Sequence, residues 1–304
     1  MSSLTDTRSA VLPRPAGGEY TTPRPRWRKR ARAIGGNLAW HGVMLVFCAF
    51  VLLPIAMVVL GSFKIVDQFF AKPYGLPDSF GLFNYRKAWH EANIATTLRN
   101  SVIATGVGVG VSTSLSCLAA YGLARFRFRG RMSIRLLFVG GLVVPVQLII
   151  LPLFITFRQI HLLGSLWPLI LLYSTFGIPL GVLVLTGFFS VLPKDLEDAA
   201  RIDGASHLQI FWRIMLPLTR PALAAVVILN GVWMWNDFFL GFILITKQNS
   251  MTLPVGIMAF RGTYSTEWGL IFASVTISIL PVVAAYLLLS RQFIAGLTAG
   301  SVKG

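Results

Sequence analysis

Long apolar runs alternate with short polar segments along the whole chain. Six runs, each near the ~20 residues that cross a bilayer as a helix, contain a single charged side chain, Asp237. These runs cover about residues 39–61, 101–124, 136–157, 167–189, 222–245 and 269–290. The pattern predicts an all-α integral membrane protein with six transmembrane helices. Prolines inside the runs, such as Pro54, Pro145 and Pro281, predict kinks that neighbouring helices can stabilise.

The composition narrows the class of protein. The 304 residues are 55% hydrophobic and 12% charged, yet they carry a net charge of +16. A charged fraction about half the ~25% of soluble domains argues against an ordinary soluble fold, and the apolar content excludes a disordered chain. Cys48 and Cys117 both lie in apolar runs, so we expect buried thiols and neither a disulfide nor a zinc framework.

The segments between the apolar runs alternate in basic content. Those at 1–38, 125–135, 190–221 and 291–304 hold 19 Lys and Arg residues, against 8 in the intervening segments. The positive-inside rule therefore places the first set, and both termini, in the cytoplasm. Basic clusters flank the apolar runs, which favours anchoring at lipid headgroups over binding of nucleic acid. The basic region before the first run is too long for a signal peptide, so we expect that run to be a retained helix.

No segment outside the membrane is long enough for an independent domain. The longest, 1–38 and 62–100, lie near or below the ~40 residues at which domains begin to fold alone. Residues 1–38 are rich in Pro, Ser, Thr and Gly and are predicted to form a largely disordered cytoplasmic tail. Residues 39–304 form the predicted transmembrane domain.

Motifs for catalysis and metal binding are missing from the sequence. No lysine follows a glycine, which excludes a Walker A loop, and His90-Glu91 lacks the second histidine of a zinc motif. We therefore predict no catalytic residue, no metal site and no cofactor in this chain. Gly106, Gly108 and Gly110 lie inside an apolar run and favour close packing of helices.

The predicted cytoplasmic segment 193–221 carries the most informative pattern. It predicts a first helix capped by Asp195 and ended by Gly204, which suits the left-handed conformation. Ser206 and Gln209 have the spacing of a capping box at the start of a second helix, which Pro217 is expected to end. The first helix is acidic and has small residues, which favours docking on a partner. A helix lying on the bilayer, the alternative, would carry a basic polar face.

This segment resembles the EAA loop of ABC importer permeases. In that pattern Glu-Ala-Ala is followed after three residues by Gly and, nine residues later, by Ile-x-Leu-Pro. The matching residues here are Asp198, Ala199, Ala200, Gly204, Ile214, Leu216 and Pro217. Asp198 replaces the glutamate of the pattern and Glu197 precedes it, so the sequence leaves open which acid makes the coupling contact. Residues 121–131, 235–238 and 295–304 also resemble the carbohydrate-uptake branch, in particular its maltose-type second permease.

The resemblance implies a permease subunit that moves a sugar or oligosaccharide inward by alternating access. Its implied partners are a second permease subunit, an external solute-binding protein, and two cytoplasmic ATPase subunits that bind ATP and Mg. Glu197 and the matched residues are the implied ATPase-coupling site, in a cell-membrane protein that binds no nucleic acid. The alternative is a self-sufficient secondary transporter or channel, for which one buried carboxylate and no visible repeat are thin support.

Polar residues in the fifth apolar run are candidates for the solute path. They are Asn230, Trp233, Asn236 and Asp237. Asn230 and Asp237 are seven residues apart and would share one helix face, although a structural role for Asp237 stays open. In the predicted outer loop, residues 84–89 are expected to form a short surface helix. It contacts a binding protein or, in the alternative, is solvated or lies on lipid headgroups.

Overall fold

A computed structural model describes the chain over residues 26–261 and 266–301, with side chains over 40–261, 266–288 and at 290. Of the tail predicted to be largely disordered, residues 1–38, the first 25 residues fall outside the described residues, whereas residues 26–38 are helical. The chain divides into two units at Pro54. Helix α1 (Arg26–Gly61) forms the described part of the N-terminal unit and continues past the division. Its segment Trp40–Gly61 is long and apolar enough to cross a membrane.

In the described part of the second unit all regular secondary structure is helical, apart from one isolated bridge between Arg261 and Thr266. The predicted all-α class is therefore confirmed for the described residues. The α-helices are α2 (Val66–Ala71), α3 (Phe83–Glu91), α4 (Ile94–Arg125), α5 (Arg131–Gly141), α6 (Val146–Gln159), α7 (Trp167–Val191), α8 (Asp195–Ile202), α9 (His207–Ile210), α10 (Leu216–Leu218), α11 (Arg220–Asn236), α12 (Phe239–Leu244), α13 (Leu253–Gly256) and α14 (Trp268–Ser301). Three shorter helical turns complete the unit: η1 (Phe211–Met215, π), η2 (Gln248–Ser250, 3₁₀) and η3 (Ile257–Phe260, 3₁₀).

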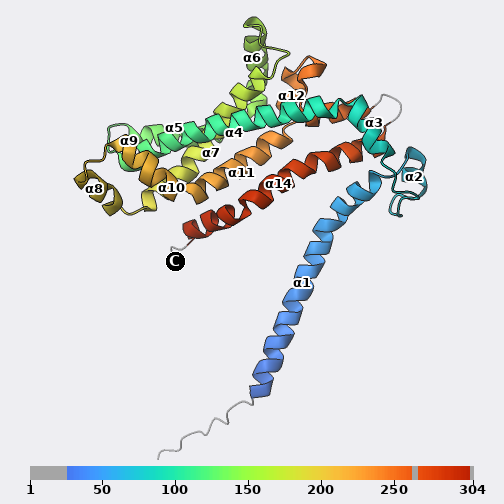
Figure 1. Ribbon diagram of the computed structural model, residues 1–304, viewed down its shortest axis with the longest axis horizontal. Coiled ribbons are helices and arrows are strands. Elements are labelled where there is room, and N and C mark those ends of the chain that lie inside the picture. Colours follow the sequence, from blue (N-terminus) through green and yellow to red (C-terminus); the bar gives the residue numbers. More distant parts are fainter. Residues whose placement is uncertain (1–25, 262–265, 302–304) are drawn as a thin grey trace, which may run out of the picture. The chain divides into compact units, whose positions relative to one another are not determined.

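Helices α4, α7, α11 and α14 run alongside one another as a bundle (Figure 1). The closest packing joins α4 to α7, and small residues make it possible. A Cβ at Gly108 would lie 2.7 Å from Tyr173 Cβ, and a Cβ at Gly177 would lie 2.8 Å from Ser112 Cβ. The expectation of glycine-mediated packing is thus met at Gly108. Gly106 and Gly110, by contrast, have nothing within 4 Å of the position of a Cβ.

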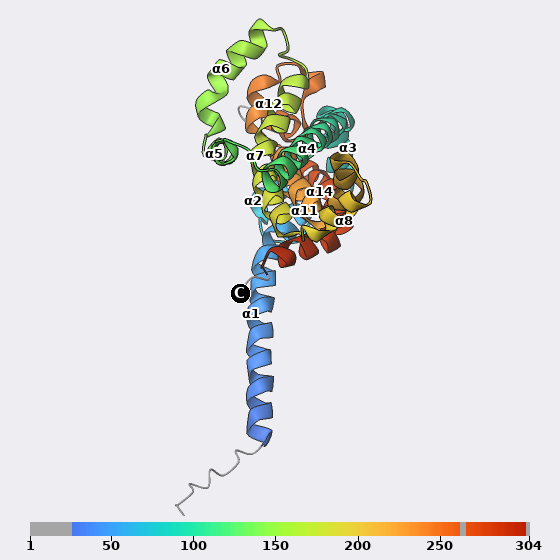
Figure 2. The same cartoon turned by 90° about the vertical axis from the view of Figure 1, so that its left-hand side faces the viewer.

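Two of the predicted spans are broken. The run at 136–157 forms α5 and α6, which meet at 90°, because Pro145 lies between them and supplies no backbone N–H to continue a helix. Figure 2 shows the two helices leaving the bundle beside α7. The run at 222–245 is interrupted after Asn236, and Asp237 adopts an extended conformation. In the described residues four helices are each long and apolar enough to cross a membrane. The number rises to six if α5 with α6, and the helical segment His207–Leu218 with α11, each count as one bent span.

Residues 62–93 form a compact cap at the end of the bundle where α14 begins. The amide of Asn84 donates to the carbonyls of Ser62 and Lys64, 2.8 Å from each. The Lys64 ammonium is buried and donates to the carbonyls of Lys72 and Pro73. The predicted surface helix at 84–89 is present as α3, but its Asn84 faces inward as a structural residue.

Candidate functional site

Helix α8 and the helical turns that follow form the segment singled out by the sequence, and they lie together at one end of the bundle (Figure 1). Asp195 is the first residue of α8, and the N-cap is Lys194, so the predicted cap by Asp195 is wrong. The acids of the first turn stabilise α8 through the helix dipole instead. Gly204 has a φ of +80°, as predicted for the residue that ends this helix. The capping box of Ser206 and Gln209 is also confirmed.

Pro217 does not end the second helix as predicted. Helical structure runs without interruption from His207 to Leu218, and residues 211–215 form a π-helical turn. Because Pro217 has no N–H to donate to the carbonyl four residues earlier, the wider turn accommodates it. The segment ends at Thr219, whose hydroxyl donates to the Met215 carbonyl, and α11 then leaves at 72°.

The two neighbouring acids of α8 have opposite surroundings. The side chain of Glu197 is 6% exposed, and its Oε1 lies 2.7 Å from Nε of Arg125 at the end of α4. The two groups form an ion pair but not a hydrogen bond, because the Nε–H bond of Arg125 does not point at Oε1 of Glu197. The side chain of Asp198 is 62% exposed and approaches only Arg201, one helical turn further along α8. Asp198 is therefore the acid that a partner can reach.

Arg125 also holds the end of α7. Its Nη2 donates to the carbonyl of Leu192, the C-cap of α7, at 2.9 Å. The sequence treated Arg125 as one of several headgroup anchors, yet its side chain is 4% exposed. The sequence offered no signal for this role, because it did not predict that Glu197 is buried, and only a buried carboxylate calls for a buried cation.

An apolar cluster lies under the segment. The Tyr121 ring contacts the rings of Phe189 and Phe211, with centroids 5.6 and 5.0 Å away. Ala200 is buried in the same cluster, whereas Ala199 is exposed. Of the other matched residues, Ile214 and Leu216 pack against the cluster, and Pro217 is half-buried.

The opposite side of the segment is apolar and uncovered. Ile202 is 87% exposed, Leu208 68% and Trp212 58%. Large apolar side chains in such positions are typical of a surface that binds another protein or a membrane. Together with Asp198 they form the exposed face of the segment.

The four candidates for the solute path do not share one surface. The Asn230 side chain is buried and donates to the Gly177 carbonyl of α7 at 3.0 Å. The Asn236 amide donates to Val232 within its own helix, and Trp233 lies against the ring of Tyr173. A role of these residues in the path stays a prediction.

Asp237 stabilises the break between α11 and α12. Its Oδ2 accepts from the Tyr173 hydroxyl at 2.9 Å, and its carboxylate accepts from the backbone N–H groups of Leu240 and Gly241. The predicted shared face with Asn230 is wrong, because α11 ends one residue before Asp237.

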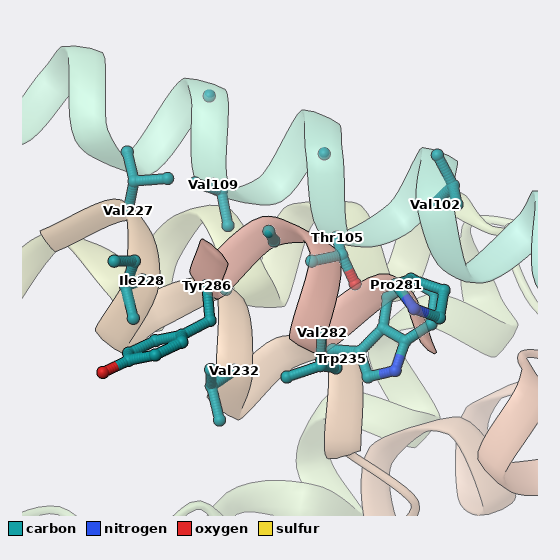
Figure 3. Close-up of a pocket in the computed structure, with 14 residues that line it drawn as sticks. Val102, Thr105, Val109, Val227, Ile228, Val232, Trp235, Pro281, Val282 and Tyr286 are labelled. Carbon is teal, nitrogen blue, oxygen red and sulfur yellow. The ribbon is translucent and has the colours of Figure 1, made fainter. Parts of the chain in front are cut away.

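A groove of about 430 Å³ lies among α4, α11 and α14 (Figure 3). Its lining is apolar, with Trp235 and Tyr286 as its aromatic members, and it includes none of the four path candidates. The Trp235 indole N–H is directed to the Ser278 carbonyl, 3.2 Å away, so it serves packing within the bundle.

Residues 112–297 match the family described as the inner membrane component of binding-protein-dependent transport systems. The chain belongs to this family. It is a multi-pass membrane protein, and the match includes α8 and its exposed face.

Several similar proteins carry more specific descriptions. A diacetylchitobiose uptake system permease, NgcG of Streptomyces coelicolor, is 35% identical over 86% of this chain and 88% of its own length. A probable permease for starch degradation products, AmyC of Thermoanaerobacterium thermosulfurigenes, is 34% identical over 82% of this chain and 91% of its own length. A crystal structure of a bacterial ABC transporter that imports alginate has a chain with the same fold. Its TM-score is 0.74 and its identity 23%, and the match covers 87% of this chain and 98% of that one.

Proposed function

We propose that this chain is a membrane-spanning permease subunit of an ATP-driven importer for a sugar or oligosaccharide. The solute crosses inward by alternating access, in a complex with a second permease subunit and an external solute-binding protein. Two cytoplasmic ATPase subunits bind ATP and Mg and supply the energy. Support for the solute class comes from relatives whose names specify carbohydrate uptake.

The observation that carries the proposal is the exposed face of the segment after α7. Asp198 presents a carboxylate to solvent, and Ile202 and Leu208 place apolar side chains beside it. A charged group beside apolar anchors suits a groove on a partner that offers a basic residue. We assign the ATPase contact to Asp198, because Glu197 is already paired inside this chain.

The test is purification of the tagged chain from its native membrane in mild detergent, followed by identification of what copurifies. We expect an ATPase, a second permease and ATP-dependent uptake of at least one of maltose, trehalose and diacetylchitobiose in proteoliposomes supplied with the binding protein. Uptake by this chain alone in liposomes without ATP would support a secondary transporter or channel and overturn the proposal.

A further inference from the structure

The buried ion pair between Arg125 and Glu197 connects parts of the chain that are distant in sequence. Arg125 ends α4, Leu192 ends α7, and Glu197 lies in the first turn of α8. One guanidinium contacts all three, through Nη2 to the Leu192 carbonyl and through Nε to the Glu197 carboxylate. Among the described residues this is the one ion pair that joins α8 to a transmembrane helix.

The backbone connections of α8 differ in stiffness. Toward α7 the link is the short stretch from Leu192 to Lys194. Toward α11 the chain passes the left-handed Gly204, the π-helical turn at 211–215 and the 72° bend at Thr219. Each of these features is a place where backbone angles can change at low cost. Movement of α8 therefore reaches α11 through a compliant path.

The link to α4 has no backbone component nearby, since 69 residues separate Arg125 from Lys194 in sequence. It consists of the ion pair and of Ala200 packed into the cluster of Tyr121 and Phe211. Alanine contributes a small contact, so the charged pair is the strong element of this link. Separation of the pair would leave the buried Arg125 without its carboxylate and Glu197 with only the half-exposed Arg201, 3.6 Å away, which makes its opening costly.

We propose that Arg125 and Glu197 form the joint that makes α4, α7 and α8 move as one body when the docked ATPase displaces α8. Both are positioning residues: they hold α8 to the transmembrane helices, while Asp198 makes the contact with the ATPase. This inference rests on the proposed function, because it requires an ATPase bound at α8. The two adjacent acids then have different roles: Glu197 binds Arg125 within the chain, and Asp198 contacts the ATPase.

The experiment uses the whole transporter, purified with its ATPase. Spin labels on Leu118→Cys in α4 and Asp195→Cys in α8 report the distance between the two helices, in a Cys48→Ser, Cys117→Ala background. Both labelled positions are exposed. Distances are compared between the nucleotide-free state and the state trapped with ATP and vanadate. With the pair intact we expect the same distance in both states.

The main variant is Arg125→Gln with Glu197→Gln, which removes both charges and so leaves no lone buried ion. We expect it to retain the ATPase and its hydrolysis to within about twofold, while the α4–α8 distance shifts by ~2 Å or more on trapping, the scale of helix shifts at moving interfaces. The conservative variant Arg125→Lys keeps a cation beside Glu197 and should show no such shift. A change only in protein stability would not produce this dependence on the nucleotide.

A matched comparison comes from the neighbouring acid. Asp198→Asn should lower retention of the ATPase by about tenfold, the effect of losing a contact worth ~1.4 kcal/mol. If the double Gln variant shows no distance shift, or loses the ATPase as Asp198→Asn does, the joint is refuted while the proposed function stands. If no ATPase copurifies with the wild-type chain, the proposed function fails and the joint fails with it.

Discussion

The glycines of α4 differ in their surroundings. Gly108 faces Tyr173 and Met234, whereas Gly106, half a turn away, faces open space in the groove. Gly108→Ala would place a Cβ 2.7 Å from Tyr173 Cβ, so α4 and α7 must separate. We expect a loss of ~1–3 kcal/mol, seen as a lower thermal midpoint in detergent. Gly106→Ala is the matched control and should leave the midpoint unchanged or raise it; equal losses in both would contradict the packing described.

Gly204 gives a second prediction for a single residue. Its φ of +80° is costly for a β-branched side chain, by ~1–3 kcal/mol. No atom lies within 4 Å of the position of a Cβ there, so the backbone angle alone decides the outcome. Gly204→Val should abolish ATP-driven uptake while the protein stays in the membrane fraction, because the turn between α8 and α9 distorts. Gly204→Asn tolerates the left-handed region and should keep most of the uptake. Normal uptake by the Val variant would show that this turn is dispensable.

At the scale of helices, the two asparagines of α11 have different roles: one packs against a neighbouring helix and the other lies on the surface. The Asn230 amide donates to the Gly177 carbonyl across the helix interface, whereas the Asn236 amide bonds within α11. Asn230→Leu should cost ~0.6–1.7 kcal/mol of stability, the range of hydrogen bonds between membrane helices. Asn236→Leu, its control, should cost little. Thermal unfolding in detergent measures both, and a larger loss at Asn236 would mean that the assignment is reversed.

The sequence predicted the helices better than their interruptions. Apolar length located α7 and the start of α14 closely, because burial in lipid depends on composition. The helix α14 continues to Ser301, beyond the apolar run that ends near residue 290. The breaks at Pro145 and Asp237 depend on which neighbours satisfy the freed backbone groups, and Tyr173, the partner of Asp237, is 64 residues away in sequence. The role of Arg125 was missed for the same reason. A count of basic residues cannot separate a headgroup anchor from the one guanidinium that folding buries beside Glu197.

For the whole molecule, the charge distribution and the broken spans together determine how the chain crosses the membrane. If α5 and α6 form one bent span, the basic turn at 126–130 and the turn at 160–166 lie on opposite sides. If they form a re-entrant loop, both turns lie on the same side. The excess of Lys and Arg in 125–135, five against one in 158–166, favours a crossing with the basic turn inside.

We therefore predict opposite accessibility for cysteines placed in these two turns. Arg129 and His161 are both exposed, so a thiol at either position can react. In the Cys48→Ser, Cys117→Ala background, a membrane-impermeant maleimide should label His161→Cys in intact cells and Arg129→Cys only after permeabilisation. Labelling of both from outside would contradict the cytoplasmic placement of the basic turn. Protection of both in intact cells would instead make α5 and α6 a re-entrant loop, and would put α7 and α8 in the wrong orientation for a cytoplasmic ATPase to reach Asp198.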